Sequence, residues 1–374
     1  MTYQHEQRGR MIKYALKRIA LGVTIMLGST VLIYALLLAA PGGPEQKFAL
    51  NPKYTAAQKE GYLKSLGLDQ PVPVQYCRWL GACRRDADGL DALVGPTGFP
   101  SFLPASISGV YTGLIHGELG YSYFSGESVA YLIAGAALPT LILAGLSIVI
   151  WLTLAVIVGV YTGVNNGGRL DNGVTTITYV LSTFPTFLLG FLLMFLFAIV
   201  LNLTPVDGMV NGRESPAFGS DLYWQYFSSN PLAAVLDLGA HLVLPVMTLV
   251  IVSFSGDSRY VRASVIDSLS MEHVRTARAK GLTRARVLMR HALRTALVPF
   301  ATNIGLALPF LFGGALITES IFSWPGIGRL TLQATNNLDY PVLMSILLIG
   351  SVMVVIGNLV ADILYAVLDP RVRL

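Results

Sequence analysis

Apolar runs long enough to cross a lipid bilayer constrain this chain more than any other feature of its sequence. The first extends from Ile19 to Ala40, and about 22 helical residues at about 1.5 Å each cover roughly 30 Å of bilayer hydrocarbon. Because the apolar core of a cleaved signal peptide is shorter, this segment is predicted to be a retained membrane helix. Five further runs predict an all-α membrane protein with six spanning helices: Pro139 to about Val164, Val174–Leu201, His241 to about Ser255, about Leu297–Ile317 and Val342–Leu368.

The charge content also indicates a membrane protein. Only 13% of the 374 residues are charged, about half of the share of about 25% in a soluble domain. The net charge of +5 falls mostly on the predicted cytoplasmic side, where basic residues set the topology and contact anionic lipids. Nucleic-acid binding is the weaker interpretation, because the sequence contains no soluble basic domain.

One long polar stretch, from Asp257 to Pro299, separates two of the apolar runs. Its acidic residues are Asp257, Asp267 and Glu272. The positive-inside rule places this basic stretch, and with six helices both termini, in the cytoplasm. We interpret the stretch as a cationic, mostly helical surface that a separate motor protein binds. Its basic residues are Arg259, Arg262, Arg275, Arg278, Lys280, Arg284, Arg286, Arg290 and Arg294.

These segments predict the organisation of the whole chain. A mixed polar region between the first two helices is placed outside the membrane, and a short amphipathic helix is expected in it at Thr55–Leu66. The predicted parts are a cytoplasmic segment (1–18), the first membrane helix (19–40), an extracytoplasmic loop (41–132), a five-helix core (133–368) containing the cytoplasmic loop (257–297), and a cytoplasmic tail (369–374).

The two cysteines, Cys77 and Cys83, fall in the same predicted extracytoplasmic loop. A disulfide between them could form in an oxidising compartment, and two free thiols are the alternative. They cannot form a structural zinc site alone, because such a site needs about four ligands.

Motifs for bond chemistry are missing from the sequence. It contains no GxxxxGK[ST] phosphate loop, no HExxH pair and no GxSxG nucleophile motif. The five histidines show no paired metal-ligand spacing. Among the polar residues in the predicted spans, Asp362 is interpreted as a hydrogen-bonded packing residue, with a proton-relay role as the alternative. The chain is therefore expected to be non-catalytic, with no cofactor and no metal of its own.

The polar stretch leads to a family resemblance. The segment EHVRTARAKGLTRARVLMRHALRTALVP resembles the cytoplasmic coupling loop of bacterial ABC-transporter permeases in the oligopeptide/dipeptide/nickel branch. Further stretches match that branch in the same order along nearly the whole chain. They are LLAAPGGP, LGLDQPVPVQYCRWL, GELGYSY, FPTFLLGFLL, HLVLPVMTL, TESIFSWPGIGRL, LDYPVL and DILYAVLDPRVR.

The resemblance also implies residues that contact the ATPase. In the family, an EAA motif followed by three residues and a glycine forms two short helices that lie in a groove of the ATPase subunit. Counting back from Gly281 places the motif on Arg275, Thr276 and Ala277, of which only Ala277 matches the general pattern. Further along the loop, Leu293 matches the general pattern, whereas His291 and Arg294 depart from it. The implied coupling residues are Glu272, Arg275, Thr276, Ala277, Lys280, Gly281, Leu282 and His291.

An insert distinguishes this chain from the usual pattern of the branch. Some thirty extra residues lie between Ala82 and about Thr112, and the cysteines flank their start. The hypothesis is that the insert contacts a substrate-binding protein or shapes the outer vestibule. A loop elaboration without function is the alternative.

The resemblance implies a six-helix permease of a type I ABC importer, with an enlarged first extracytoplasmic loop. The implied partners are a second homologous permease, two ATPase subunits that hold ATP and Mg, an extracytoplasmic substrate-binding protein and membrane lipids. The location would be the cytoplasmic membrane of a bacterium or archaeon. Di- or oligopeptides are the first expectation for the substrate, ahead of nickel chelates and oligosaccharides. A secondary transporter or an intramembrane enzyme is the rival, but the sequence shows neither an inverted repeat nor a catalytic set.

Overall fold

The computed structural model describes residues 20–36, 55, 60–61, 63–64, 68–83, 113–114, 117–313 and 315–368. These residues are mainly helical, and the only β pairing among them is an isolated bridge between Tyr121 and Ser128. The prediction of an all-α protein is therefore confirmed. The chain divides into two units, which are described separately below. The first comprises Met1–Val23, Ala137–Arg329 and Gly350–Leu374, and the second comprises Thr24–Ala136 and Leu330–Ile349.

The apolar runs predicted from the sequence overlap helices, but their bounds differ. The fifth, about Leu297–Ile317, extends past a helix that ends at Gly313 into the short helix Leu316–Ile321. Within the described residues, three helices are apolar and long enough to cross a membrane, and a bent pair counts as a fourth if it forms one span. The first predicted span appears as the apolar helix Ala20–Leu36, and the rest of that prediction lies outside the described residues. The main helices are α5 (Val129–Val164), α6 (Arg169–Thr183), α7 (Thr186–Leu193), α9 (Pro231–Ser270), α12 (Leu293–Gly313) and α15 (Tyr340–Leu368).

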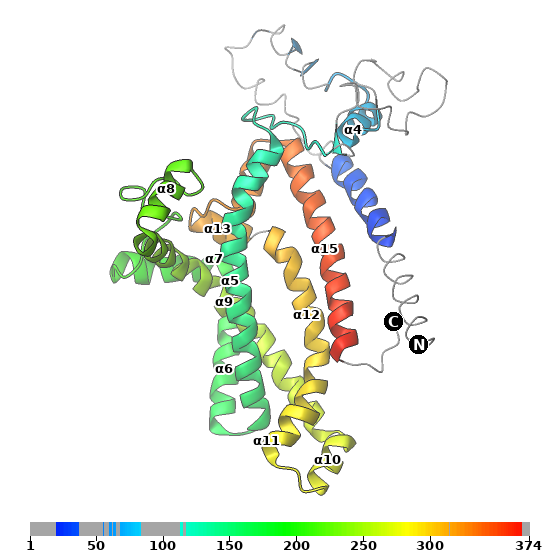
Figure 1. Cartoon of the computed structure of the whole chain (residues 1–374), viewed down its shortest axis with the longest axis vertical. Helices are drawn as coiled ribbons and strands as arrows, with labels where there is room; N and C mark the ends of the chain where they lie inside the picture. The colour runs from blue at the N-terminus through cyan, green and yellow to red at the C-terminus, as the bar shows by residue number, and fades with distance from the viewer. Residues whose placement is uncertain are drawn as a thin grey trace. The chain divides into compact units, whose positions relative to one another are not determined.

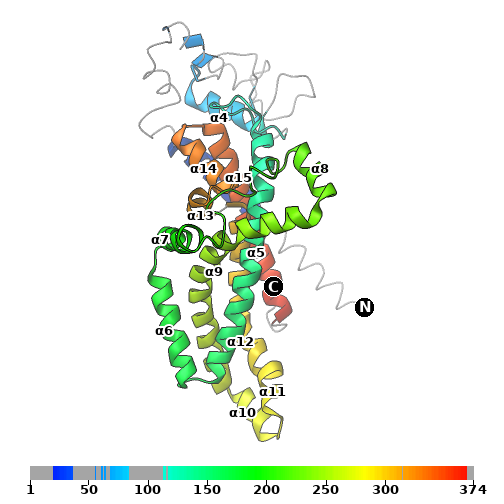
Figure 2. The same cartoon turned by 90° about the vertical axis from the view of Figure 1, so that its left-hand side faces the viewer.

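The third predicted span, Val174–Leu201, is not one continuous helix. It is divided between α6 and α7, and α7 continues as the π-helix η3 (Met194–Val200). The axis of α6 and the axis of the α7–η3 segment are bent by 101° relative to each other. Figure 2 shows α7 turning away from the end of α6. Pro185 causes the break, because proline lacks a backbone donor and pushes the preceding residue out of the helical region. Phe184 accordingly has an extended backbone, with ψ of 126°.

The fourth predicted span, from His241 to about Ser255, was much too short. In the structure it is the middle of α9, which has 40 residues and is about 60 Å long at about 1.5 Å per residue. Its last third belongs to the stretch that the sequence assigned to the cytoplasmic loop. Polar residues near the end of α9 lowered the apparent hydrophobicity there without interrupting the helix.

Glycines let the helices of the first unit approach closely. A Cβ on Gly159 of α5 would lie 2.6 Å from the carbonyl oxygen of Ser258 and 2.7 Å from the Cβ of Val261, both on α9. One turn along α5, a Cβ on Gly163 would lie 2.9 Å from Val265. Small residues at such crossings give van der Waals contact between helix backbones, which drives helix association in lipid.

The connection between α12 and α15 contains a fully buried carboxylate. Glu319, in the short helix α13 (Leu316–Ile321), is 0% exposed. Its carboxylate accepts hydrogen bonds from the Thr140 hydroxyl at 3.0 Å and from the backbone N–H groups of Arg329 and Ala315 at 3.0 and 3.3 Å. Trp324, which follows α13, donates its indole N–H to the Pro139 carbonyl at 2.9 Å. These bonds attach the connection to α5. The chain then continues into α14 (Ile327–Asn336).

In the second unit, polar groups join the first helix to α4 (Val72–Leu80). The Tyr34 hydroxyl donates to the Gln75 side chain at 2.8 Å, and the hydroxyls of Thr30 and Tyr76 lie 2.9 Å apart. Elsewhere in this unit, Asp339 accepts hydrogen bonds from the Ser122 hydroxyl and from the backbone N–H of Tyr123. The predicted helix Thr55–Leu66 lies mostly outside the described residues.

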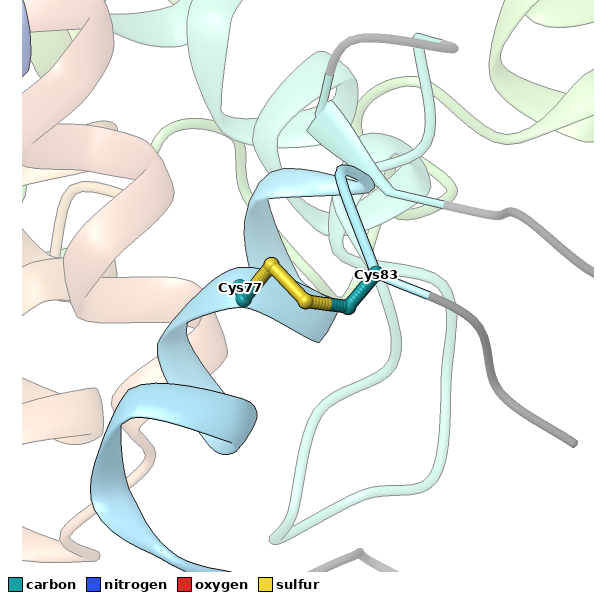
Figure 3. The surroundings of a disulfide bond; sticks show 2 residues. All are labelled: Cys77 and Cys83. Carbon is teal, nitrogen blue, oxygen red and sulfur yellow. A yellow bond between two sulfur atoms is a disulfide. The ribbon is translucent and has the colours of Figure 1, made fainter. Parts of the chain in front are cut away.

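A disulfide joins Cys77 in α4 to Cys83, with 5.3 Å between their Cα atoms (Figure 3). Between them, Gly81 ends α4 with a left-handed backbone. A Cβ on Gly113 would lie 2.5 Å from the backbone nitrogen of Gly81. The described chain therefore stops at Cys83 and resumes at Gly113 close to the end of α4. Residues 84–112 lie outside the described part of the chain.

Replacing Gly159 with alanine is expected to lower the free energy of unfolding by about 1–3 kcal/mol, because the new methyl group overlaps the backbone of α9. The matched control is Gly135→Ala on the same helix, where a Cβ would meet nothing within 4 Å. That change is expected to be neutral or to add up to about 1 kcal/mol through helix propensity. Thermal denaturation in detergent compares the two variants, and equal shifts would contradict the close packing of α5 on α9.

Alkylation of the denatured, non-reduced protein is expected to add no label. After reduction, alkylation is expected to add two labels, one for each thiol. The number of labels is measured from the intact mass of the protein. The variant carrying Cys77→Ser and Cys83→Ser is expected to lose about 2 kcal/mol of stability, the chain-entropy value for so short a loop. Two labels before reduction would show that the disulfide is absent.

Candidate functional site

The candidate site is a helical hairpin that follows α9. It consists of α10 (Glu272–Ala279), α11 (Arg284–Val287) and the π-helical turn η4 (Leu288–Ala292), which leads directly into α12. Figure 1 shows α10 and α11 beside the ends of α9 and α12. Only Met271, with an extended backbone, separates α9 from α10. The residues predicted to be coupling residues all lie in this hairpin.

An apolar interior holds the hairpin together. Val274 and Ala277, one turn apart on α10, pack against Val287 and Ala292, and all four side chains are at most 4% exposed. Leu282, one of the predicted residues, packs against the same cluster. The Ser268 hydroxyl near the end of α9 donates to the Ala292 carbonyl at 2.7 Å. The hairpin is thus packed on the helix ends that carry it.

Gly281 makes the turn between α10 and α11. Its φ is +76°, a left-handed conformation that costs an L-residue with a side chain roughly 1–2 kcal/mol. A Cβ at this position would meet no atom within 4 Å. Backbone conformation, and not lack of space, therefore favours glycine here.

The other predicted residues lie mainly on the outside of the hairpin. Glu272, Arg275 and Thr276 are exposed, as are Lys280 and Gly281, whereas His291 is partly buried. The Arg275 guanidinium lies 3.1 Å from the Glu272 carboxylate, and such an exposed pair adds only about 0.3–0.5 kcal/mol to helix stability. The predicted set therefore divides into an interior pair, Ala277 and Leu282, and an exposed group.

The exposed side of the hairpin is strongly basic. Seven of the nine basic residues predicted for the loop are exposed. The exposed thioethers of Met271 and Met289 accompany them, at 40% and 64% exposure. We call these nine residues the basic hairpin surface: Met271, Arg275, Arg278, Lys280, Arg284, Arg286, Met289, Arg290 and Arg294. It combines positive charge with flexible apolar groups, a composition suited to binding another protein.

The remaining two arginines do not belong to that surface. Arg262 forms two hydrogen bonds with the Asp171 carboxylate of α6, at 2.6 and 2.8 Å. The guanidinium of Arg259 lies 4.1 Å from the ring centroid of Tyr179, also on α6. Interpreting all nine basic residues as one cationic surface was therefore wrong for these two. Asp171 was missed, because it falls between two predicted spans, Pro139 to about Val164 and Val174–Leu201.

The described residues of the hairpin show no grouping that could bind a metal ion. In the part of the chain that the structure describes, no three His, Cys, Asp or Glu side chains are grouped so that they could hold a metal ion. The chemistry that the arrangement supports is recognition of a protein surface.

Comparison with known proteins identifies the family of the chain. The family described as "Binding-protein-dependent transport system inner membrane component" matches residues 155–374, which include the hairpin. The oligopeptide transport system permease protein AppB of Bacillus subtilis is 31% identical over 97% of this chain and 100% of its own length. The dipeptide transport system permease protein DppB of Escherichia coli is 31% identical over 97% of this chain and 99% of its own length.

Among solved structures, the inward-facing MetNI methionine ABC transporter aligns with 64% of this chain and 97% of the matched chain, at a TM-score of 0.48 and 14% identity. The family match covers more than half of the chain, and the identity to the permeases extends over nearly its whole length. The chain therefore belongs to the binding-protein-dependent transport system inner membrane components, the non-catalytic permeases of ABC importers.

Proposed function

We propose that this permease forms half of the pathway by which an ATP-driven importer carries di- or oligopeptides across the cytoplasmic membrane. The observation that carries the proposal is the packed α10–α11 hairpin with its basic outer surface, in a chain that belongs to this family. The substrate class is supported by relatives named as oligopeptide, dipeptide and di/tripeptide permeases.

The proposed complex contains four further subunits. A second homologous permease completes the pathway, two ATPases bind ATP and Mg below it, and an extracytoplasmic binding protein delivers the peptide. The hairpin and both termini face the cytoplasm in this arrangement, as the positive-inside rule requires for the basic loop. The insert at 82–112 is then extracytoplasmic, and we propose that it contacts the binding protein or shapes the outer vestibule.

The exposed residues of the hairpin are the proposed contacts with the ATPase. Glu272, Arg275, Thr276 and Lys280 project from α10 or its end, and Gly281 sets the angle at which α11 follows. His291 lies where the hairpin joins α12, and its carbonyl oxygen is 3.2 Å from the His273 ring nitrogen. The buried Ala277 and the partly buried Leu282 act from inside, by keeping these groups in one fixed arrangement.

A fixed arrangement is what coupling requires. ATP binding would close the motor dimer and displace the hairpin, which has two covalent connections, to α9 and to α12, and a packed interior. A rigid hairpin passes that displacement to both helices, whereas a loose loop would absorb it. The result would be a rigid-body switch between two states of the bundle, biased by a ligand bound in another chain.

The test is ATP-driven uptake of a labelled dipeptide by proteoliposomes that contain the whole complex. Gly281→Val is expected to lower uptake and ATPase co-purification at least about fivefold, because a β-branched residue resists the left-handed backbone. Gly281→Asn is the matched control and is expected to retain most of both, since asparagine tolerates this conformation. Uptake by the wild-type chain without ATP or ATPases would refute the proposed function and favour a secondary transporter.

A further inference from the structure

The ion pair between Asp171 and Arg262 joins α6 to α9 just before the hairpin. Both guanidinium–carboxylate bonds are short, and the Asp171 carboxylate is 0% exposed while the Arg262 side chain is 24% exposed. The carboxylate also accepts a bond from the backbone N–H of Gly167 at 2.8 Å. Arg262 in turn donates to the Asn166 side chain at 2.8 Å. Two parallel bonds fix direction as well as distance.

Arg259, one turn earlier on α9, makes a second attachment to α6. Its guanidinium lies over the Tyr179 ring and donates to the Ser182 hydroxyl at 3.1 Å. Another nitrogen of the same group donates to the Ser255 carbonyl at 2.9 Å, so the side chain is held along its own helix. Both ends of α6 are therefore attached to the same segment of α9.

The same segment of α9 is packed on two more helices. Gly159 and Gly163 of α5 lie directly against it. On α12, Ala296 and Phe300 are 2% exposed and pack with Val261 and Val265 of α9. The cytoplasmic segment of α9 thus has apolar contacts with α5 and α12, and polar contacts with α6.

This segment is also the part of α9 nearest to the hairpin. From Arg262 the helix continues without a break to Ser270, and Ser268 is bonded to Ala292 of the hairpin. Beyond the other end of α6, the chain turns by 101° into α7. There a Cβ on Gly190 would lie 3.5–3.6 Å from side-chain atoms of Ile321, Phe322 and Thr248. A continuous series of contacts runs from the hairpin, through α9 and α6, to the bent helix.

We infer that Asp171 and Arg262 are positioning residues for coupling, which lock α6 to α9 so that displacement of the hairpin moves the α6–α7 bend. The inference rests on the proposed function and extends it from the ATPase contact to the membrane helices. Apolar contacts alone would let α6 slide along α9, because they are not directional. A bidentate ion pair does not allow sliding, since a shift of one turn would leave a buried carboxylate without its partner.

The test uses the complete transporter and the variants Asp171→Asn, Arg262→Gln and the two combined. Each single change is expected to leave the ATPases bound and hydrolysing ATP, while peptide transported per ATP falls roughly fivefold, within the range of measured coupling effects. The double variant is expected to be no worse than either single one, because both changes break the same contact. The matched control is Asp207→Asn, an exposed carboxylate between η3 and α9, which should leave the ratio unchanged.

The outcomes separate this inference from the proposed function. If the wild-type complex transports peptide and every variant keeps the wild-type ratio, coupling does not pass through the ion pair and the inference is refuted. If the effects of the two single changes multiply in the double variant, the residues act independently, and the inference fails as well. Loss of assembly, ATP hydrolysis and uptake in equal proportion would indicate only a structural role and also overturns it.

A second readout does not depend on transport. Spin labels at the exposed positions Leu170 on α6 and Ser270 at the end of α9, each changed to cysteine, report the separation of the two helices. In the wild-type background the distance is expected to be the same with and without a non-hydrolysable ATP analogue, because the helices move together. In the Asp171→Asn variant, the distribution of distances between the two labels should broaden or shift on nucleotide binding. A nucleotide-dependent shift of the wild-type distance would show that α6 is not locked to α9.

Discussion

Hydrocarbon supplies no hydrogen bonds, so each polar group placed in it needs a partner from the chain itself, and the rest of this structure follows from that constraint. It makes the spanning segments helical and brings them together through glycines, as at Gly159 and Gly163 of α5. It also explains how Glu319 can be fully buried: three donors from α5 and from the residues around α13 surround its carboxylate.

The same requirement explains why the ion pair of Asp171 and Arg262 resists movement of α6 along α9. Apolar side chains can find similar apolar neighbours after helices shift by one turn, whereas a buried carboxylate that loses its arginine becomes strongly unfavourable. The segment of α9 before the hairpin is thus joined to its neighbours in two ways. Glycine contacts fix how closely α5 approaches it, and the ion pair fixes the register of α6 along it.

The approximate places of most apolar helices could be predicted from the sequence, because long apolar runs indicate them directly, but their ends could not. The bend at Pro185 could have been predicted too, since a proline in the middle of an apolar run signals a break. The length of α9 could not, because its last turns carry Arg259, Arg262 and Asp267 and so look like a loop. Gly281 and the two short helices were indicated by the family motif, whereas the left-handed backbone of Gly281 was not. The partners of Asp171 were not, because pairing across about ninety residues leaves no local pattern.

The base of the insert has a consequence for how this protein could change over time. The chain departs after Cys83 and comes back at Gly113, whose backbone lies against Gly81, so whatever is placed between them leaves and returns at one point. The entropy needed to close a loop grows only with the logarithm of its length. Lineages could therefore lengthen, shorten or replace this segment at small energetic cost, and an experimenter could use the same place to graft a reporter domain.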